Sequence, residues 1–255
     1  MNFTKSGNPM LSNRAMTKMK AKLTSATSID TLGQGIDHDV HMTVGGSVNK
    51  TYILGSILLF AALVSYTIPL GIFMPVGALG AAAVFFYTSW KPHHSPITAP
   101  IFAVLEGLFV GTVSAIYASA FEGIILIALI GTLGTLFLML GIYKSGLIPV
   151  TQKFRMGVSM AVGAIMLIYL ASWIGHFVGF EIPYIHDGGP LGIGITVLVI
   201  GIAALNLLLD FDNFEKGEQM QAPQYMEWYF AMGLVFTIVW LYVEFLRLVS
   251  KLQSD

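Results

Sequence analysis

The sequence predicts an all-α membrane protein, built as a bundle of seven transmembrane helices. Of its 255 residues, 55% are hydrophobic and only 11% are charged, with a mean hydropathy of +0.75. Ordinary soluble domains carry about 25% charged residues, so this composition indicates a chain surrounded mostly by lipid. The net charge of −1 indicates no nucleic-acid partner. The absence of cysteine excludes disulfides, Cys-ligated zinc and thiol catalysis.

Seven segments meet or approach the roughly 20 apolar residues that a helix needs to cross a bilayer core of about 30 Å. Continuous apolarity rather than an amphipathic pattern marks them. The letters "IPL" between the first two predict a tight helical hairpin, broken at Pro69. Six spans with one re-entrant segment are the alternative. The seven segments cover residues 51–67, 70–88, 98–119, 123–143, 156–178, 189–209 and 228–249.

A polar, basic arm over residues 1–48 precedes the transmembrane domain of residues 49–255. Its composition predicts a flexible or surface-lying segment, and nothing in it resembles a cleavable signal. If the N-terminus is cytoplasmic, all basic residues except Arg247 and Lys251 fall on the cytoplasmic side. The positive-inside rule therefore predicts a cytoplasmic N-terminus and a C-terminus on the opposite side.

Ionisable side chains inside a span are costly, which makes each of them a candidate functional residue. Glu106 lies in the third span, roughly 12 Å from its cytoplasmic edge at 1.5 Å per residue. A carboxylate at this depth pairs with a cation, faces water or keeps its proton. The alternative to a site on a polar path is a protonated packing residue.

The sixth span ends in "NLLLDFDNFEKG". Asn206, Asp210 and Asn213 follow one another at i, i+4 and i+7, which places them on one helical face. Asp212 points nearly the opposite way, so we expect it to meet headgroups or cytoplasm. Because Asn206 lies a full turn deeper and suits lipid poorly, Asp210 is predicted to end a polar track from the membrane interior. A solvated helix end is the alternative.

The seventh span carries Thr237, Glu244 and Arg247. Glu244 lies about 24 Å from the start of that helix, close to its outer end. The three-residue spacing of Glu244 and Arg247 predicts an ion pair at the membrane interface.

Motifs of catalysis are absent from the sequence. It contains no HExxH, no GxSxG and no phosphate-binding P-loop. We therefore expect no enzyme activity, no metal site and no cofactor, and calcium enters only as an ion that could permeate.

Several long motifs together closely resemble a bacterial branch of the Bax inhibitor-1 family, often called YccA-like. The resemblance covers nearly the whole chain past the N-terminal arm. The motifs are "SGNPML", "MTVGGSVNKT", "SPITAPIFAVLEGLFVG", "GLIPVTQKFRMG", "GGPLGIG", "ALNLLLDFDNFEKG" and "APQYMEWYFAMGL".

The resemblance implies a cell (inner) membrane protein of seven helices with the last helix central. It also implies a pH-sensitive calcium leak, in which two aspartates on the last two helices share a proton and hold the cytoplasmic side closed. Asp210 matches the first aspartate best, and Asp212 is the alternative. Thr237 falls at the second position without a gap, whereas an alignment on Glu244 shifts everything else by seven residues. The two-aspartate latch is thus expected to be incomplete here.

We expect Glu106 to supply the missing carboxylate. Thr237 lies about 14 Å, and Glu106 about 12 Å, from the inner end of its own helix, so the two could share one depth above Asp210. The sequence thus predicts a pH-sensitive cation leak, with Asp210, Asp212 and Glu106 as sensor or gate and Asn206, Asn213 and Thr237 as its polar lining. The alternative is a non-conducting regulator that binds another membrane protein, such as a quality-control protease. The oligomeric state stays open.

Overall fold

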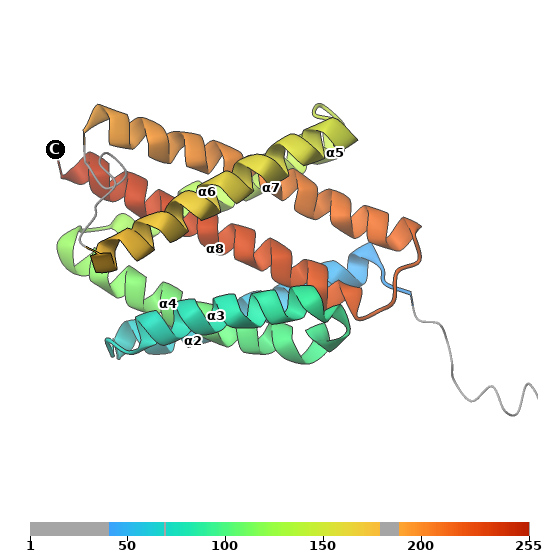
Figure 1. The fold of residues 1–255 in the computed structure, drawn as a ribbon, viewed down its shortest axis with the longest axis horizontal. Helices are drawn as coiled ribbons and strands as arrows, with labels where there is room; N and C mark the ends of the chain where they lie inside the picture. Colours follow the sequence, from blue (N-terminus) through green and yellow to red (C-terminus); the bar gives the residue numbers. More distant parts are fainter. Residues whose placement is uncertain (1–40, 69, 179–188, 255) are drawn as a thin grey trace, which may run out of the picture. The chain divides into compact units, whose positions relative to one another are not determined.

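Seven long helices make up the fold (Figure 1). The computed structural model describes residues 41–68, 70–178 and 189–254. In these ranges all seven helices are long and apolar enough to cross a membrane, which confirms the predicted all-α membrane bundle of seven helices. Most of the predicted arm, residues 1–40, lies outside the described residues, as does Pro69. The elements are α2 (Val44–Thr67), α3 (Phe73–Trp90), the short 3-10 helix η2 (Pro92–His94), α4 (Ser95–Ala120), α5 (Ile124–Ser145), α6 (Gln152–Val178), α7 (Pro190–Gln219) and α8 (Met226–Gln253).

Two helices extend well beyond their predicted spans. Helix α2 begins at Val44 rather than at residue 51, and α7 runs on from residue 209 to Gln219. Apolar length marks only the part of a helix that suits lipid, whereas the helix itself continues as long as its polar side chains find partners or water.

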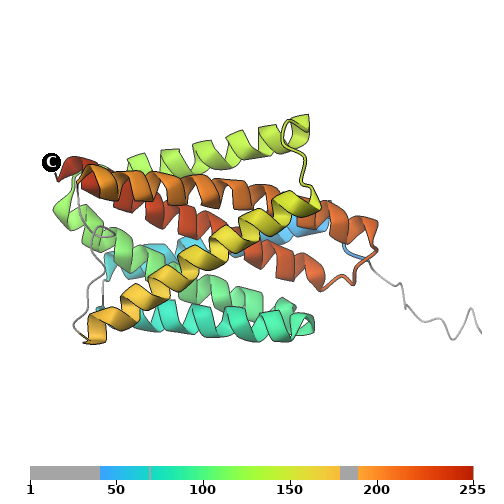
Figure 2. The same cartoon turned by 45° about the horizontal axis from the view of Figure 1, so that its top comes forward.

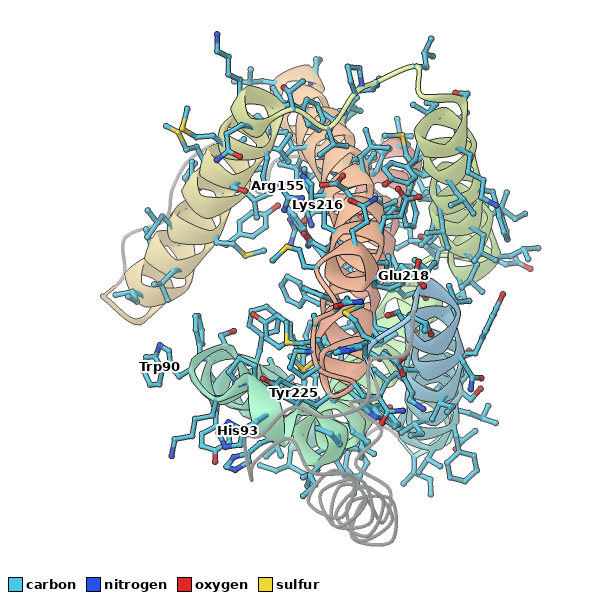
Figure 3. The ribbon with its side chains drawn as sticks, turned by 90° about the vertical axis from the view of Figure 1, so that its right-hand side faces the viewer. Trp90, His93, Arg155, Lys216, Glu218 and Tyr225 are labelled. Atoms are coloured by element: carbon cyan, nitrogen blue, oxygen red, sulfur yellow. The ribbon has the colours of Figure 1, made fainter. Side chains whose placement is uncertain are left out.

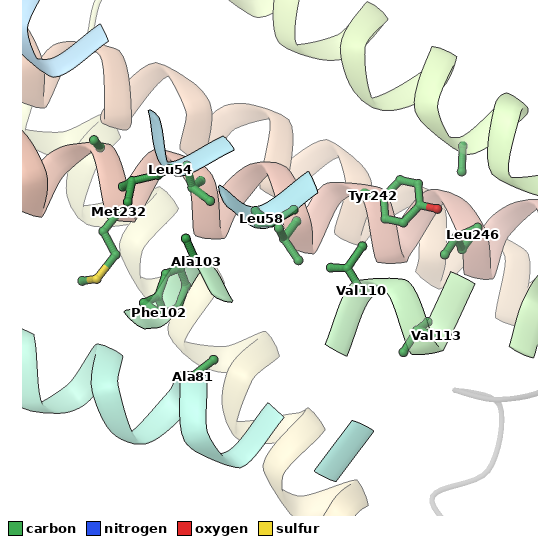
Figure 4. Packing of buried hydrophobic residues seen from close by; sticks show 14 of the residues in the cluster. Leu54, Leu58, Ala81, Phe102, Ala103, Val110, Val113, Met232, Tyr242 and Leu246 are labelled. Carbon is green, nitrogen blue, oxygen red and sulfur yellow. The ribbon is translucent and has the colours of Figure 1, made fainter. Parts of the chain in front are cut away.

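Helix α8 lies at the centre of the bundle, as predicted, and packs against α2, α4, α5 and α7. It is also the most buried of the seven spans. Two apolar clusters share it. The first joins α8 to α2, α3, α4 and the start of α5 (Figure 4), and the second joins α8 to α5, α6 and α7. The central helix therefore separates two packed halves.

Glycines set the closest helix approach in the first half. A methyl group at Gly107 would lie 2.4 Å from the Leu58 carbonyl oxygen of α2, and one at Gly111 would lie 2.1 Å from that of Ala62. The two glycines are four residues apart, the small-xxx-small spacing that lets membrane helices pack backbone to backbone.

The start of α2 is held by the turn between α7 and α8. Thr43 caps α2 by accepting the Gly46 N–H at 2.8 Å, and its own N–H donates to the buried Glu227 carboxylate at 3.0 Å. The Met42 N–H donates to the Ala222 carbonyl at 2.8 Å. Residues 41–43 are therefore an ordered part of the bundle, although the predicted arm reached residue 48.

Helix α6 is the most exposed of the seven spans. It runs diagonally across the bundle and packs mainly against α7 (Figures 1 and 2). Such a helix turns most of its surface outward, while apolar side chains such as Ile165 pack in the second cluster.

Candidate functional site

The sequence-predicted residues Asn206, Asp210 and Thr237 meet between α7 and α8. The Thr237 hydroxyl donates to Asp210 Oδ2 at 2.7 Å. The Asn206 amide donates to Thr237 Oγ1 at 3.0 Å and, more weakly, to Asp210 Oδ2 at 3.4 Å. Thr237 is 1% exposed and Asp210 is 9% exposed, so this hydrogen-bonded triad lies inside the bundle.

Helical spacing explains how the triad forms. Asn206 and Asp210 are four residues apart on α7, so both point to the same neighbour. Thr237 lies on the face of central α8 that meets α7, and its hydroxyl is also 3.2 Å from the carbonyl oxygen of Gly233, one turn earlier. A hydroxyl carries a single proton, so Thr237 donates to either Asp210 or Gly233 at any moment. The contact can therefore accommodate a change of charge on Asp210.

Asp212 and Asn213 belong to a second polar contact, between α6 and α7. Arg155 donates a hydrogen bond from Nη2 to Asp212 and one from Nη1 to Asn213, the latter at 2.7 Å. Lys216 pairs with Asp212 at 2.7 Å, and Figure 3 shows Arg155 and Lys216 close together. Arg155 is half-buried, and the Asp212 side chain is only 13% exposed.

This second contact corrects two expectations. We expected Asp212 to meet headgroups or cytoplasm, but α7 continues past it and Arg155 reaches it from α6. Asn213 lies on the face of Asp210 by spacing, yet its side-chain oxygen accepts from Arg155 rather than meeting Asp210. Asp212 is therefore an ion-pair partner that fastens α6 to α7.

Glu244 and Arg247 form the predicted i,i+3 ion pair, with Arg247 Nη1 at 3.0 Å from Glu244 Oε1. Glu244 is 1% exposed, so the pair lies inside the bundle rather than on its surface. Tyr169 of α6 donates to the same Glu244 oxygen at 2.7 Å and accepts from Arg247 at 2.8 Å. The Trp240 indole N–H also donates to Glu244 Oε1, at 3.3 Å. This contact fastens α6 to α8.

Glu106 is buried, at 7% exposure. Its neighbours at one turn, Phe102 and Val110, are buried in the first cluster. Among the residues that the structure describes, none donates a hydrogen bond to Glu106 or forms an ion pair with it. The structure thus brings Asn206, Asp210 and Thr237 together and leaves Glu106 outside their hydrogen bonds. A joint role of Glu106 with Thr237 stays a prediction.

The sequence reasoning missed Arg155, Tyr169 and Trp240. Arg155 counted only as a basic loop residue, although it stands within "TQKFRMG" at the entrance to an apolar run. A basic residue at such a position can point its side chain toward a neighbouring helix instead of toward water. Tyr169 and Trp240 carried no signal, since aromatic residues are common in membrane spans. In the described part of the chain, no three His, Asp or Glu side chains converge as a metal site would need.

The apolar helices and the buried polar contacts between them define a multi-pass membrane protein. Within that class, residues 8–254 match the family described as Bax inhibitor 1 like. The chain belongs to this family, as its motifs predicted. Comparisons with curated proteins and with solved structures found no match.

Proposed function

We propose that this chain is a pH-sensitive cation leak pathway, selective for hard cations such as calcium, and that Asp210 is its gating acid. The observation that carries the proposal is the 2.7 Å hydrogen bond from Thr237 to Asp210, which joins α7 to the central helix within the membrane domain. Membership of the Bax inhibitor 1 like family agrees with it.

The triad supplies the chemistry that such a gate needs. Carboxylate, amide and hydroxyl oxygens are the ligands that calcium prefers. A proton on Asp210 would remove the one formal charge of the triad and change which group Thr237 donates to. Because two packed helices meet at this point, a local change of charge can bias their arrangement. The acid that would gain or lose the proton is thus itself a partner in the hydrogen bond between α7 and α8.

Calcium flux into dye-loaded vesicles tests the proposal. The wild type, reconstituted between about pH 5 and 8, should leak in a pH-dependent manner. Asp210→Asn has nearly the same shape without the titrating group, so its flux should lose the pH dependence. Glu122→Gln, an exposed carboxylate in the α4–α5 turn, is the matched control and should behave as the wild type. Equal pH profiles for the wild type and Asp210→Asn would reject Asp210 as the gate.

A non-conducting regulator of a membrane protease is the second candidate. Met42 contacts Ala222 in the α7–α8 turn, and Thr43 contacts Glu227 of α8. These contacts favour the second candidate, because a partner bound to residues 1–40 would act next to the two helices that form the Asp210 triad. Verified reconstitution without flux, together with copurification of a protease that is lost on deletion of residues 1–40, would establish the regulator.

We also place the protein in the cell (inner) membrane, with the α7–α8 turn in the cytoplasm. Because the chain has no cysteine, single cysteines report sidedness directly. A membrane-impermeant thiol reagent should label Glu122→Cys in intact cells and spare Met220→Cys, at an exposed position in the α7–α8 turn. Labelling of Met220→Cys alone would invert the topology.

A further inference from the structure

Glu106 is a buried carboxylate that the proposed gate does not use. The residues one turn away on α4, Phe102, Ala103 and Val110, are 1%, 0% and 8% exposed. They pack in the first cluster with α8 residues such as Met232 (Figure 4). The neighbours of Glu106 one turn away on α4 are therefore apolar and belong to the first cluster.

The Glu106 carboxylate has no protein partner in the described residues, yet it is not sealed off. In the described residues, every buried side-chain oxygen or nitrogen that is completely enclosed by protein atoms has a hydrogen-bond partner. Glu106 has none, so its carboxylate oxygens are not completely enclosed by protein atoms. A buried acid that is not completely enclosed can gain and lose a proton.

Charged side chains on the elements packed against α4 do not neutralise Glu106. Helix α3 contains no Asp, Glu, Lys or Arg, and Glu106 is the single charged residue of α4. The others are engaged elsewhere or lie at helix ends: Lys50 over the Trp228 ring, His94 against Tyr87 and His93, Lys144 in the last turn of α5, Glu227 of α8 with Thr43, Glu244 with Arg247, and Lys251 on the Gly192 carbonyl.

Taking an unpaired carboxylate out of water is expensive, so such a group neutralises itself by binding a cation. Calcium requires six to eight oxygen ligands, and the described residues contain no cluster of three acidic or His side chains. A proton requires only the carboxylate itself.

We propose that Glu106 is a proton-binding site of its own, in the first packed half of the bundle and independent of the Asp210 triad. It follows from burial, missing countercharge and incomplete enclosure by the protein. It does not rest on ion conduction and stands even if the chain proves to be a non-conducting regulator.

Infrared difference spectroscopy of the full chain in vesicles tests this site, because a protonated carboxylic acid has its own C=O stretch. Between about pH 5 and 8, the wild type should show such a band, which should shift when heavy water replaces water. Glu106→Gln should lose it, whereas Asp210→Asn and Glu122→Gln should keep it. Asp210, as the proposed gating acid, can give a band of its own, so the test concerns the component that carboxyl-¹³C glutamate shifts. A glutamate component that survives in Glu106→Gln would overturn the proposal.

Isotope labelling keeps the test valid if Glu106→Gln fails to fold. In the wild type, carboxyl-¹³C glutamate should shift the band and carboxyl-¹³C aspartate should not. The absence of any protonated glutamate band would overturn the site. Loss of the band on adding calcium at constant pH would overturn it as well, because the carboxylate would then bind a metal cation in preference to the proton.

Discussion

Removal of the Thr237 hydroxyl isolates the contact between α7 and α8. Thr237→Val has nearly the same shape but neither donates to Asp210 at 2.7 Å nor accepts from Asn206 at 3.0 Å. Hydrogen bonds between membrane helices contribute about 0.6 kcal/mol on average and up to about 1.7 kcal/mol, and bonds to charged groups contribute about 1.5–3 kcal/mol. Both partners are buried, so we expect a coupling of about 1.5 kcal/mol between Thr237 and Asp210.

A double-mutant cycle measures this coupling. Thr237→Val, Asp210→Ala and the double variant are unfolded reversibly in mixed micelles with rising amounts of a denaturing detergent, and tryptophan fluorescence follows the free energy of unfolding. Thr237→Ser is the control, because it keeps the hydroxyl and loses only a methyl group, at a cost of about 0.8 kcal/mol. Independent sites add within about 0.3–0.5 kcal/mol, so a coupling that small would refute the hydrogen bond as a link between α7 and α8.

The same unfolding assay checks two further contacts. Gly111→Ala forces a methyl group to within 2.1 Å of the Ala62 carbonyl oxygen, so it should lower the free energy of unfolding by about 1–3 kcal/mol through overpacking. Gly134→Ala is the control: a methyl group there has no neighbouring atom within 4 Å, and the change should be neutral or stabilising by up to about 1 kcal/mol. Equal losses in the two variants would contradict the close approach of α2 and α4. Glu244→Ala leaves Arg247 without its carboxylate and should lower the free energy of unfolding by about 3–5 kcal/mol. Replacing both residues with leucine should recover most of that loss. A single variant as stable as the double variant would contradict a buried ion pair.

The membrane bundle was predictable because its causes are local in the sequence. A helix that crosses lipid needs about 20 apolar residues and satisfies its own backbone hydrogen bonds. Apolar length alone therefore located all seven spans. It could not locate the end of α7, because most residues from Asp210 to Gln219 are polar. They stay helical because polar side chains find partners such as Arg155 and because Phe211 and Phe214 pack in the second cluster.

Without the family resemblance, which placed Thr237 opposite Asp210, partners were predictable only within one helix. The spacing of Asn206 and Asp210, and that of Glu244 and Arg247, specifies which side chains share a face. No spacing rule specifies which other helix lies opposite that face. For this reason neither the contact of Asn213 with Arg155 nor that of Glu244 with Tyr169 was predicted.

The sequence by itself determined the fold class, the family and the acids worth testing, since composition, apolar length and motifs are properties of contiguous residues. Only the tertiary structure decided that Thr237 reaches Asp210, that Arg155 fastens α6 to α7 and that Glu106 lies without a partner in the described part of the chain. The physical reason is that these contacts join helices far apart in sequence, and their existence depends on how the helices pack around α8.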